Sequence, residues 1–371
     1  MARSRTKQRC VVIGGGVIGC SVAWELARHG IAVTVLERSV PGAEASSAAA
    51  GILGAQFESS EPGPLFELAL QSRALHAPWA KRLAQATGID VEYRATGLVH
   101  VEFGAAALKR VRDQYAFQRK AGQRVVELGA RSVRERVPSL SPKVEGGLHF
   151  PDDARVDPPD LFRALRIAAE RAGAVFRSGA YVRRVVSAAG RVSGVELDDA
   201  SVVPATDVVV AAGSWSSLVE GAPLPSGGVV PARGQIVELT LQMPLFDGVV
   251  HGPRCYLVPR DDGRVLIGST LEFVGYKREV TAGAVRDLLD AAIELCPALS
   301  EAQLSRSWSN FRPYVKDGLP AIGPTETEGL VIATGHHRNG ILLAPITAEV
   351  VGALVRGRRP SLDLTAFSPT R

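Results

Sequence analysis

The chain has 371 residues, of which 46% are apolar and 22% charged, and its formal net charge is +5. This length exceeds the usual size of one hydrophobic core, so it predicts two domains in an ordinary soluble, globular protein. The basic residues are scattered among acidic ones and form no stripe interleaved with aromatics, which argues against a nucleic-acid-binding protein.

Four cysteines are present, and none of them belongs to a CxxC pair or lies near a histidine at metal-ligand spacing. They are Cys10, Cys20, Cys255 and Cys296. We therefore expect neither a metal site nor a disulfide framework.

The first nine residues, MARSRTKQR, are basic and predict a disordered flank. The apolar run that follows, 10–23, superficially resembles a secretory signal. Four glycines interrupt that run, and no separate cleavage region follows it. No later segment reaches the roughly 20 apolar residues that a membrane-spanning helix needs. We expect a cytoplasmic protein.

A strand, a glycine turn, a helix and a second strand open the chain. Residues 10–13 form a short apolar run, GGGVIG occupies 14–19, and a helical pattern extends from 17 to about 29. A second apolar run, 32–36, ends at Glu37. This order is typical of a βαβ unit that binds a dinucleotide.

Each glycine of this motif has a physical role. Gly14 permits the tight turn, Gly16 lets the backbone approach a pyrophosphate, and Gly19 lets the helix pack closely against the strand. The N–H groups at the helix start, around Val17 and Ile18, point toward the phosphates together with the positive end of the helix dipole.

Glu37 is placed to accept hydrogen bonds from a ribose hydroxyl. Its charge would repel a 2′-phosphate, which argues against NADP. We count the adjacent Arg38 among the cofactor-binding residues. At this point both FAD and NAD remain open.

Tiny residues follow the second strand in the segment 42–51, GAEASSAAAG. Small side chains allow the backbone to lie close to a bulky ligand, and Ser46 or Ser47 could donate to phosphate or flavin oxygens. The candidate contacts in this segment also include Ala49, Ala50 and Gly51. A flexible loop is the alternative interpretation. An NAD enzyme has no obvious need for this segment, so it favours FAD.

Five later segments complete a recognisable pattern. They are AAGSWS (211–216), PARGQ (231–235), CYLVPRDDGRVLIGST (255–270), FRPYVKDGLPAIG (311–323) and TGHHRNGILLAP (334–345). With GGGVIG and EASSAAAGIL (44–53), they resemble the glycine oxidase and D-amino acid oxidase family of flavoproteins essentially from end to end. The glycine oxidase branch, associated with the thiazole arm of thiamine synthesis, is the more similar.

The resemblance implies a non-covalently bound FAD. In monomeric sarcosine oxidases a cysteine linked to the flavin stands in the stretch where this chain has Arg312. The resemblance places further cofactor contacts at Val182, Ala212, Gly213, His336, His337, Arg338, Asn339, Gly340 and Ile341. A helix from about 340 to 355 would direct the positive end of its dipole at the flavin and stabilise its reduced form. The family commonly has an aromatic residue where this chain has His337, so the pocket shape differs there.

The substrate residues that the resemblance implies are Tyr256, Arg312 and Arg338. Residues 255–270 read as a β-hairpin, because two strand-like runs flank the turn signal at 262–263. Tyr256 would donate to the carboxylate of an amino acid, although a strand tyrosine is usually a packing residue. Arg312 would hold that carboxylate in a bidentate grip, with a structural ion pair as the alternative. Arg338 would be a second substrate arginine or a solvated loop residue.

The fold class expected is α/β, or α+β overall. A discontinuous Rossmann-like FAD domain, 1–85, 150–225 and 325–371, would contain a parallel sheet flanked by helices. The remainder, 86–149 and 226–324, would form an antiparallel substrate-binding sheet with flanking helices at about 104–121 and 281–295.

The activity expected is oxidative deamination of a small amino acid, with oxygen as acceptor and hydrogen peroxide as product. Glycine, sarcosine, D-alanine and D-proline remain open as substrates. The product imine would hydrolyse or pass to a thiazole synthase, and the family suggests a homo-oligomer, possibly a tetramer. The alternatives are a flavin dehydrogenase that passes electrons to a quinone or partner protein, and a non-catalytic FAD-binding protein.

Overall fold

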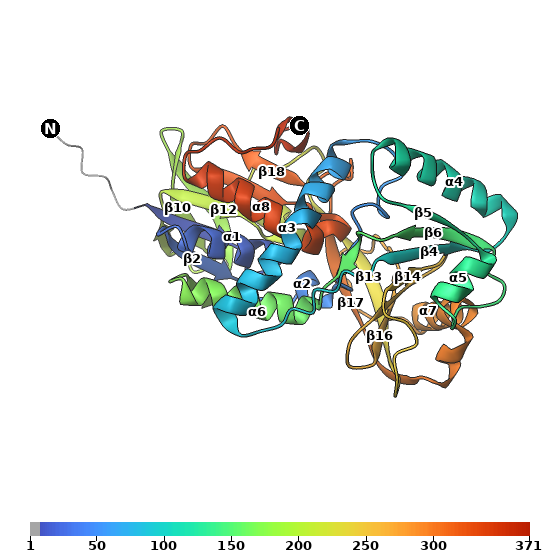
Figure 1. Cartoon of the computed structure of the whole chain (residues 1–371). Helices are drawn as coiled ribbons and strands as arrows, with labels where there is room; N and C mark the ends of the chain where they lie inside the picture. The colour runs from blue at the N-terminus through green and yellow to red at the C-terminus, as the bar shows by residue number, and fades with distance from the viewer. Residues whose placement is uncertain (1–7) are drawn as a thin grey trace.

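The computed structural model describes residues 8–371, so the predicted basic flank lies outside the described residues except for Gln8 and Arg9. Within that range the chain forms two large sheets, which occupy the two halves of the molecule in Figure 1. Each sheet is covered by helices and has its own hydrophobic core. The α/β fold class predicted from the sequence is confirmed.

The first sheet has the strand order β18-β19-β12-β1-β2-β8. Its strands are β1 (Arg9–Ile13), β2 (Ala32–Glu37), β8 (Val175–Ser178), β12 (Asp207–Val210), β18 (Ala321–Pro324) and β19 (Leu330–Thr334). All neighbours pair in parallel except β18, which runs antiparallel to β19 at the edge. The central strands are nearly continuous apolar runs because both faces of the sheet are covered, one by helices and the other by a small sheet of β9 (Val182–Ala188), β10 (Arg191–Leu197) and β11 (Val202–Pro204).

Four helices pack in this half of the molecule. They are α1 (Val17–Ala27), α3 (Pro64–Thr87), α6 (Pro158–Arg171) and α8 (Gly340–Val355). Every residue of α1 is buried, and α1 packs against both α6 and α8. Among the described residues one segment, His337–Val355, has the length and composition of a membrane span, and 67% of it is buried inside this fold. Because α8 packs against α1 and α3, we interpret it as a core helix.

The second sheet has the order β17-β13-β16-β15-β14-β4-β6-β5. Its strands are β4 (Leu98–Glu102), β5 (Val126–Gly129), β6 (Gly146–Phe150), β13 (Val230–Thr240), β14 (Val249–His251), β15 (Tyr256–Pro259), β16 (Arg264–Gly268) and β17 (Gln303–Tyr314). Only β4 and β14 pair in parallel, so the expectation of an antiparallel sheet holds elsewhere. The predicted hairpin is β15-β16, with Gly263 at a φ of 87° in its turn.

The helices of this half are α4 (Ala105–Lys120), α5 (Ala130–Arg136) and α7 (Ala282–Leu295), close to the predicted ranges for α4 and α7. The smaller elements are α2 (Ala45–Ala48), β3 (Ile52–Leu53), β7 (Ala154–Arg155), β9 (Val182–Ala188), β10 (Arg191–Leu197), β11 (Val202–Pro204), η1 (Gly213–Leu218), η2 (Pro297–Glu301), η3 (His337–Asn339) and η4 (Thr365–Phe367). The domain limits proposed from the sequence stay a prediction.

Candidate active site

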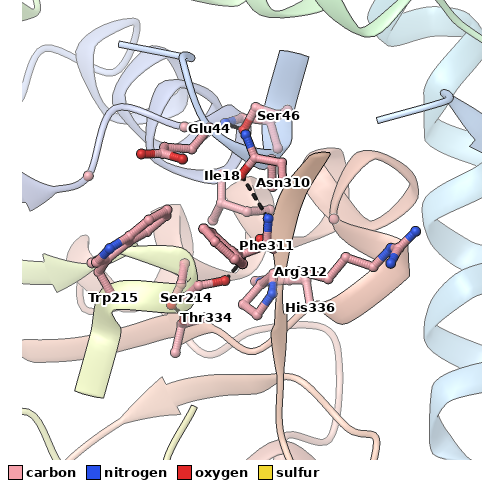
Figure 2. A pocket seen from close by; sticks show the side chains of 18 of the residues that line it. Ile18, Glu44, Ser46, Ser214, Trp215, Asn310, Phe311, Arg312, Thr334 and His336 are labelled. Atoms are coloured by element: carbon pink, nitrogen blue, oxygen red, sulfur yellow. Dashed lines mark hydrogen bonds between the residues drawn. The ribbon is translucent and has the colours of Figure 1, made fainter. Parts of the chain in front are cut away.

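A large cavity is lined by residues from both sheets. Its empty volume is about 1620 Å³ with the open mouth included. The first sheet contributes the end of β1, the start of α1 and the end of β12, and the second contributes Ile236, Tyr256 and Arg312. The lining extends from the glycine turn after β1 to Arg312, which suits an extended dinucleotide with a small substrate beside it. Figure 2 shows part of this lining.

The glycine turn after β1 has no room for side chains at two of its positions. Gly14 has a φ of 103°, and a Cβ there would lie 2.5 Å from the carbonyl oxygen of Ala211 on the neighbouring chain segment. A Cβ on Gly19 would lie 1.9 Å from the carbonyl oxygen of Gly14, because α1 packs directly on the turn. The roles predicted for these two glycines therefore have a steric basis.

The N-terminus of α1 opens into the cavity. The N–H of Val17 donates to Ser46 Oγ at 2.8 Å, and the next N–H groups, those of Ile18 and Gly19, have no acceptor within the helix because they belong to its first turn. The Ser46 hydroxyl keeps its own proton free to donate. Backbone N–H donors, a hydroxyl and the positive end of the helix dipole are thus directed at the same part of the cavity. This combination of groups is the one that binds a pyrophosphate.

Glu37 is buried at the end of β2 and lines the cavity. Its Oε2 accepts from the N–H of Gly15 and its Oε1 from that of Ser39, each at 2.9 Å. Each carboxylate oxygen has a second lone pair, so Glu37 can still accept from a ribose hydroxyl. Its neighbour Arg38 lies over the ring of Trp215, 3.8 Å from the ring centre.

Arg312 is half-buried on β17, in the opposite sheet. Its Nη1 donates to the carbonyl oxygen of Thr270 at 3.1 Å, and its Nη2 to Ser269 Oγ at 2.5 Å. Within residues 8–371 no carboxylate lies within ion-pair distance of it. Burial lowers the pKa of Arg312, with the nearby Arg338 adding to the effect. A partly desolvated guanidinium without a counter-ion is costly, so this site is suited to an anionic ligand.

Tyr256 lies beside Arg312 on the same cavity wall. Burial raises the pKa of its phenol, while the Arg312 guanidinium acts to lower it. A phenol with a raised pKa is a neutral hydrogen-bond donor at neutral pH. Together, Arg312 and Tyr256 present the charge and the donors that bind a carboxylate.

Two glycines make the space that these side chains occupy. A Cβ on Gly234 of β13 would lie 2.1 Å from Arg312 Nη1, and a Cβ on Gly268 of β16 would lie 2.2 Å from the Tyr256 hydroxyl oxygen. Both glycines lie within the motifs quoted from the sequence, but the sequence analysis assigned them no role. The sequence does not show which residues of the neighbouring strands contact Arg312 and Tyr256, because that depends on the strand register.

Arg338 lies at the cavity rim. Its side chain is 53% exposed and forms an ion pair with Glu58 at 2.5 Å. Arg338 thus shares features of both interpretations from the sequence: it lines the cavity, as a substrate arginine would, and it is half-exposed, as a solvated loop residue would be. Glu58 was missed because nothing in its local sequence marks it.

The two adjacent histidines lie in different surroundings. His336 is buried, and its Nε2 is 3.1 Å from Thr347 Oγ1. Burial lowers its pKa to about 3. The pKa of His337 is also lowered to about 3, by burial first and then by Arg338 and Arg312. Both imidazoles are therefore neutral in the physiological range.

Most residues predicted to contact the cofactor line the cavity. They are Gly14, Gly16, Val17, Ile18, Glu37, Arg38, Ser46, Ala49, Ala50, Gly51, Val182, Ala212, Gly213, His336, His337, Arg338, Gly340 and Ile341. Gly19, Ser47 and Asn339 lie outside this lining. Binding of the cofactor by these residues stays a prediction.

An aromatic and polar group was missed by the sequence analysis. Ser214 donates to the carbonyl oxygen of Phe311 at 2.9 Å, and the N–H of Phe311 donates to Asn310 Oδ1 at 2.8 Å, as Figure 2 shows. The ring of Trp215 packs edge-on against that of Phe311, with centroids 6.1 Å apart. These contacts fix the η1 turn to β17. The AAGSWS and FRPY motifs, which contain Ser214, Trp215 and Phe311, were the only sequence features that could have indicated this group.

All four cysteines are buried and free of disulfide bonds. Burial raises the pKa of the Cys10 and Cys20 thiols, which is the behaviour of small buried apolar residues. Among residues 8–371, no three His, Cys, Asp or Glu side chains come together as a metal-ligand group.

Comparison with known proteins identifies close relatives. The family model described as DAO, FAD dependent oxidoreductase, matches residues 9–354. The chain is 38% identical to a glycine oxidase of Geobacillus kaustophilus, over 97% of this chain and 96% of that protein. It is 36% identical to a bifunctional protein ThiO/ThiG of Synechocystis sp., over 99% of this chain but 54% of the longer relative. The crystal structure of glycine oxidase from Geobacillus kaustophilus superimposes with a TM-score of 0.94 at 37% identity, covering 98% of this chain and 99% of that one.

Proposed function

Because the chain belongs to the FAD-dependent oxidoreductase family, we propose that it is a glycine oxidase that binds FAD non-covalently. It converts glycine, oxygen and water to glyoxylate, ammonia and hydrogen peroxide, and it accepts related small amines such as sarcosine and D-alanine. One observation carries the substrate class: a half-buried arginine, Arg312, without a carboxylate partner among the described residues, at the substrate end of the cavity.

The residues present fit FAD. The turn at Gly14, the N-terminus of α1 and Ser46 suit the pyrophosphate, and Glu37 suits a ribose. When bound, FAD would supply the two-electron oxidation of the amine, with oxygen as the final acceptor. No cysteine is among the residues that line the cavity, which supports a non-covalent cofactor.

The main work of the protein is to position the substrate. Arg312 binds the carboxylate of the amino acid with parallel N–H donors, and the Tyr256 hydroxyl donates a further hydrogen bond. These contacts fix the α-carbon at one place and orientation relative to the cofactor. The mechanism needs the amine in its neutral form but no dedicated catalytic base in the cavity.

The start of α8 contributes electrostatically. Gly340 and Ile341 line the cavity at the first turn of this helix, where backbone N–H groups lack acceptors. The positive end of the dipole stabilises negative charge nearby, and the neutral His336 and His337 add none of their own.

Partners and location are proposed from the similarities. The match to about half of the ThiO/ThiG proteins supports passage of the imine product to a thiazole synthase. We expect a cytoplasmic homo-oligomer such as a tetramer, with oxygen as the electron acceptor.

A peroxide-coupled assay of the purified flavoprotein tests the function. Glycine, sarcosine, D-alanine and D-proline are compared, with L-alanine as the control. Peroxide formation from glycine above the others supports the proposal. Bleaching of the flavin without peroxide indicates a dehydrogenase with another acceptor, and no bleaching by any of them contradicts the substrate class.

A further inference from the structure

Arg260, which the proposed chemistry does not use, lies behind the cavity wall. It follows β15, and its side chain is the largest among those that are almost fully buried, with 1% exposure. Its Nη2 donates to the carbonyl oxygen of Ala50 at 2.7 Å, and its Nε donates to Asp157 Oδ2 at 3.1 Å. Ala50 lines the cavity, whereas Arg260 and Asp157 do not.

This buried pair joins three parts of the chain. Asp157 caps the N-terminus of α6, where it accepts from the N–H of Asp160 at 3.2 Å. Burial lowers the pKa of Arg260, and the charge of Asp157 counteracts this. Burying two charges costs several kcal/mol per ion before they pair. Apolar residues of similar volume would therefore fill this space at no loss of stability. The contact that an apolar residue could not make is the one to the Ala50 carbonyl.

That contact determines how the Ala50–Gly51 peptide is oriented. In a trans peptide the C=O and the following N–H point in opposite directions. Because the Ala50 carbonyl points to Arg260, away from the cavity, the N–H of Gly51 points toward it. Among the described residues this N–H has no backbone or side-chain acceptor, although Gly51 is buried. Buried donors are nearly always paired, so an acceptor is to be expected from a bound ligand.

The other side of the same peptide is also held. The Gly51 carbonyl accepts from the N–H of Val156 at 3.0 Å, and Gly51 has a φ of 78°. A Cβ on Gly51 would lie 2.1 Å from the Val156 carbonyl oxygen. Ala50 packs in the same cluster as Tyr256 and Ile236, which places the free N–H on the substrate side of the cavity.

We propose that Arg260 is a positioning residue for the cofactor. By holding the Ala50 carbonyl it directs the Gly51 N–H at the ring system of bound FAD and polarises that peptide bond. The resulting donor favours the reduced, more negatively charged form of FAD. This proposal rests on FAD binding as described under the proposed function, but not on glycine as the substrate.

The test compares Arg260→Met and Arg260→Lys with a matched control, Arg155→Met. Arg155 is 3% exposed and pairs with Glu92 and Asp261, so its loss also removes a buried guanidinium. Its side chain is not among those that line the cavity. The readouts are the FAD midpoint potential, the dissociation constant of FAD from the apoprotein, the Tm, and kcat and KM for glycine.

We expect Arg260→Met to shift the reduction equilibrium against reduced FAD by about tenfold, or about 30 mV for a two-electron couple. FAD affinity and kcat should fall by a similar factor while KM stays nearly constant, and Arg260→Lys should restore part of each loss. Arg155→Met should lower the Tm without moving the potential. Equal potentials in wild type and Arg260→Met, together with a Tm loss matching that of Arg155→Met, would reduce Arg260 to a structural residue. If wild type fails to oxidise glycine but the potential still shifts, only the proposed substrate is wrong.

Discussion

The guanidinium of Arg312 lies across the backbone of Gly234 on the adjacent strand. A Cβ at position 234 would come within 2.1 Å of Nη1 and 2.4 Å of Cζ. The carboxylate site therefore depends on an absent side chain in β13 as much as on the arginine in β17. Tyr256 has the same relationship to Gly268 of β16.

Gly234→Ala should displace Arg312 while leaving the fold intact, because the residue that must move is a side chain. We expect KM for glycine to rise at least tenfold, with kcat less affected and FAD still bound. Gly283→Ala is the control, since a Cβ there meets no atom within 4 Å. Steady-state kinetics with both variants checks this, and an unchanged KM in Gly234→Ala would mean that the guanidinium does not hold the substrate.

Arg312 and Arg338 should differ in importance. Arg312→Ala removes a guanidinium whose two charge-assisted hydrogen bonds to the substrate carboxylate are worth about 3 kcal/mol, so KM should rise about 100-fold while FAD stays bound. Arg338→Ala should change KM much less, because its side chain is half-exposed and already paired with Glu58. Steady-state kinetics with glycine, run in parallel on wild type and the two variants, measures both KM values. A larger effect at Arg338 than at Arg312 would contradict this assignment.

Gly14→Ala should abolish FAD binding. The substitution combines a left-handed backbone, φ 103°, with a contact of 2.5 Å to the Ala211 carbonyl oxygen. Gly30→Ala is a matched control, because its φ is 79° but its Cβ would meet no atom within 4 Å. We expect colourless protein from the first variant and yellow protein, slightly less stable, from the second. Visible absorbance and Tm measure both, and full FAD content in Gly14→Ala would be inconsistent with the turn described.

Acid should destabilise the protein through buried histidines. Burial lowers the pKa of His76 and His149 to about 4 and that of His336 to about 3, from 6.5. Below pH 6.5 the unfolded chain therefore binds more protons than the folded one, so stability falls as the pH drops toward 4. Burial raises the pKa of Asp153 to about 6 and also raises the pKa values of Glu92, Asp160 and Glu349, which acts in the opposite direction.

The Tm should accordingly decrease from pH 7 to pH 5, as measured by circular dichroism in buffers of equal ionic strength. His76→Gln should flatten this decrease, whereas His29→Gln, at an exposed position, should not. A Tm that rises on acidification would show that Asp153 and other carboxyl groups dominate.

The sequence alone determined the parts of the protein that depend on neighbours along the chain. The βαβ unit, the hairpin at 255–270 and the helix α8 follow from apolar periodicity and turn residues within short windows, and all three are present. The family pattern also located Tyr256 and Arg312. The antiparallel pairing of the edge strand β18 with β19 was not predicted, because the direction of pairing at a sheet edge leaves no local pattern in the sequence.

Tertiary structure decided the contacts that complete the site. Arg260 and Ala50 are 210 positions apart in the sequence, and their hydrogen bond exists only because β15 folds back against the cavity segment. In the same way, the pairing of β13 with β17 places Gly234 next to the Arg312 guanidinium. Chain packing likewise places Glu58 next to Arg338. Such contacts form between segments that share no local signal, because burial and hydrogen bonding select them only after the two sheets have packed together.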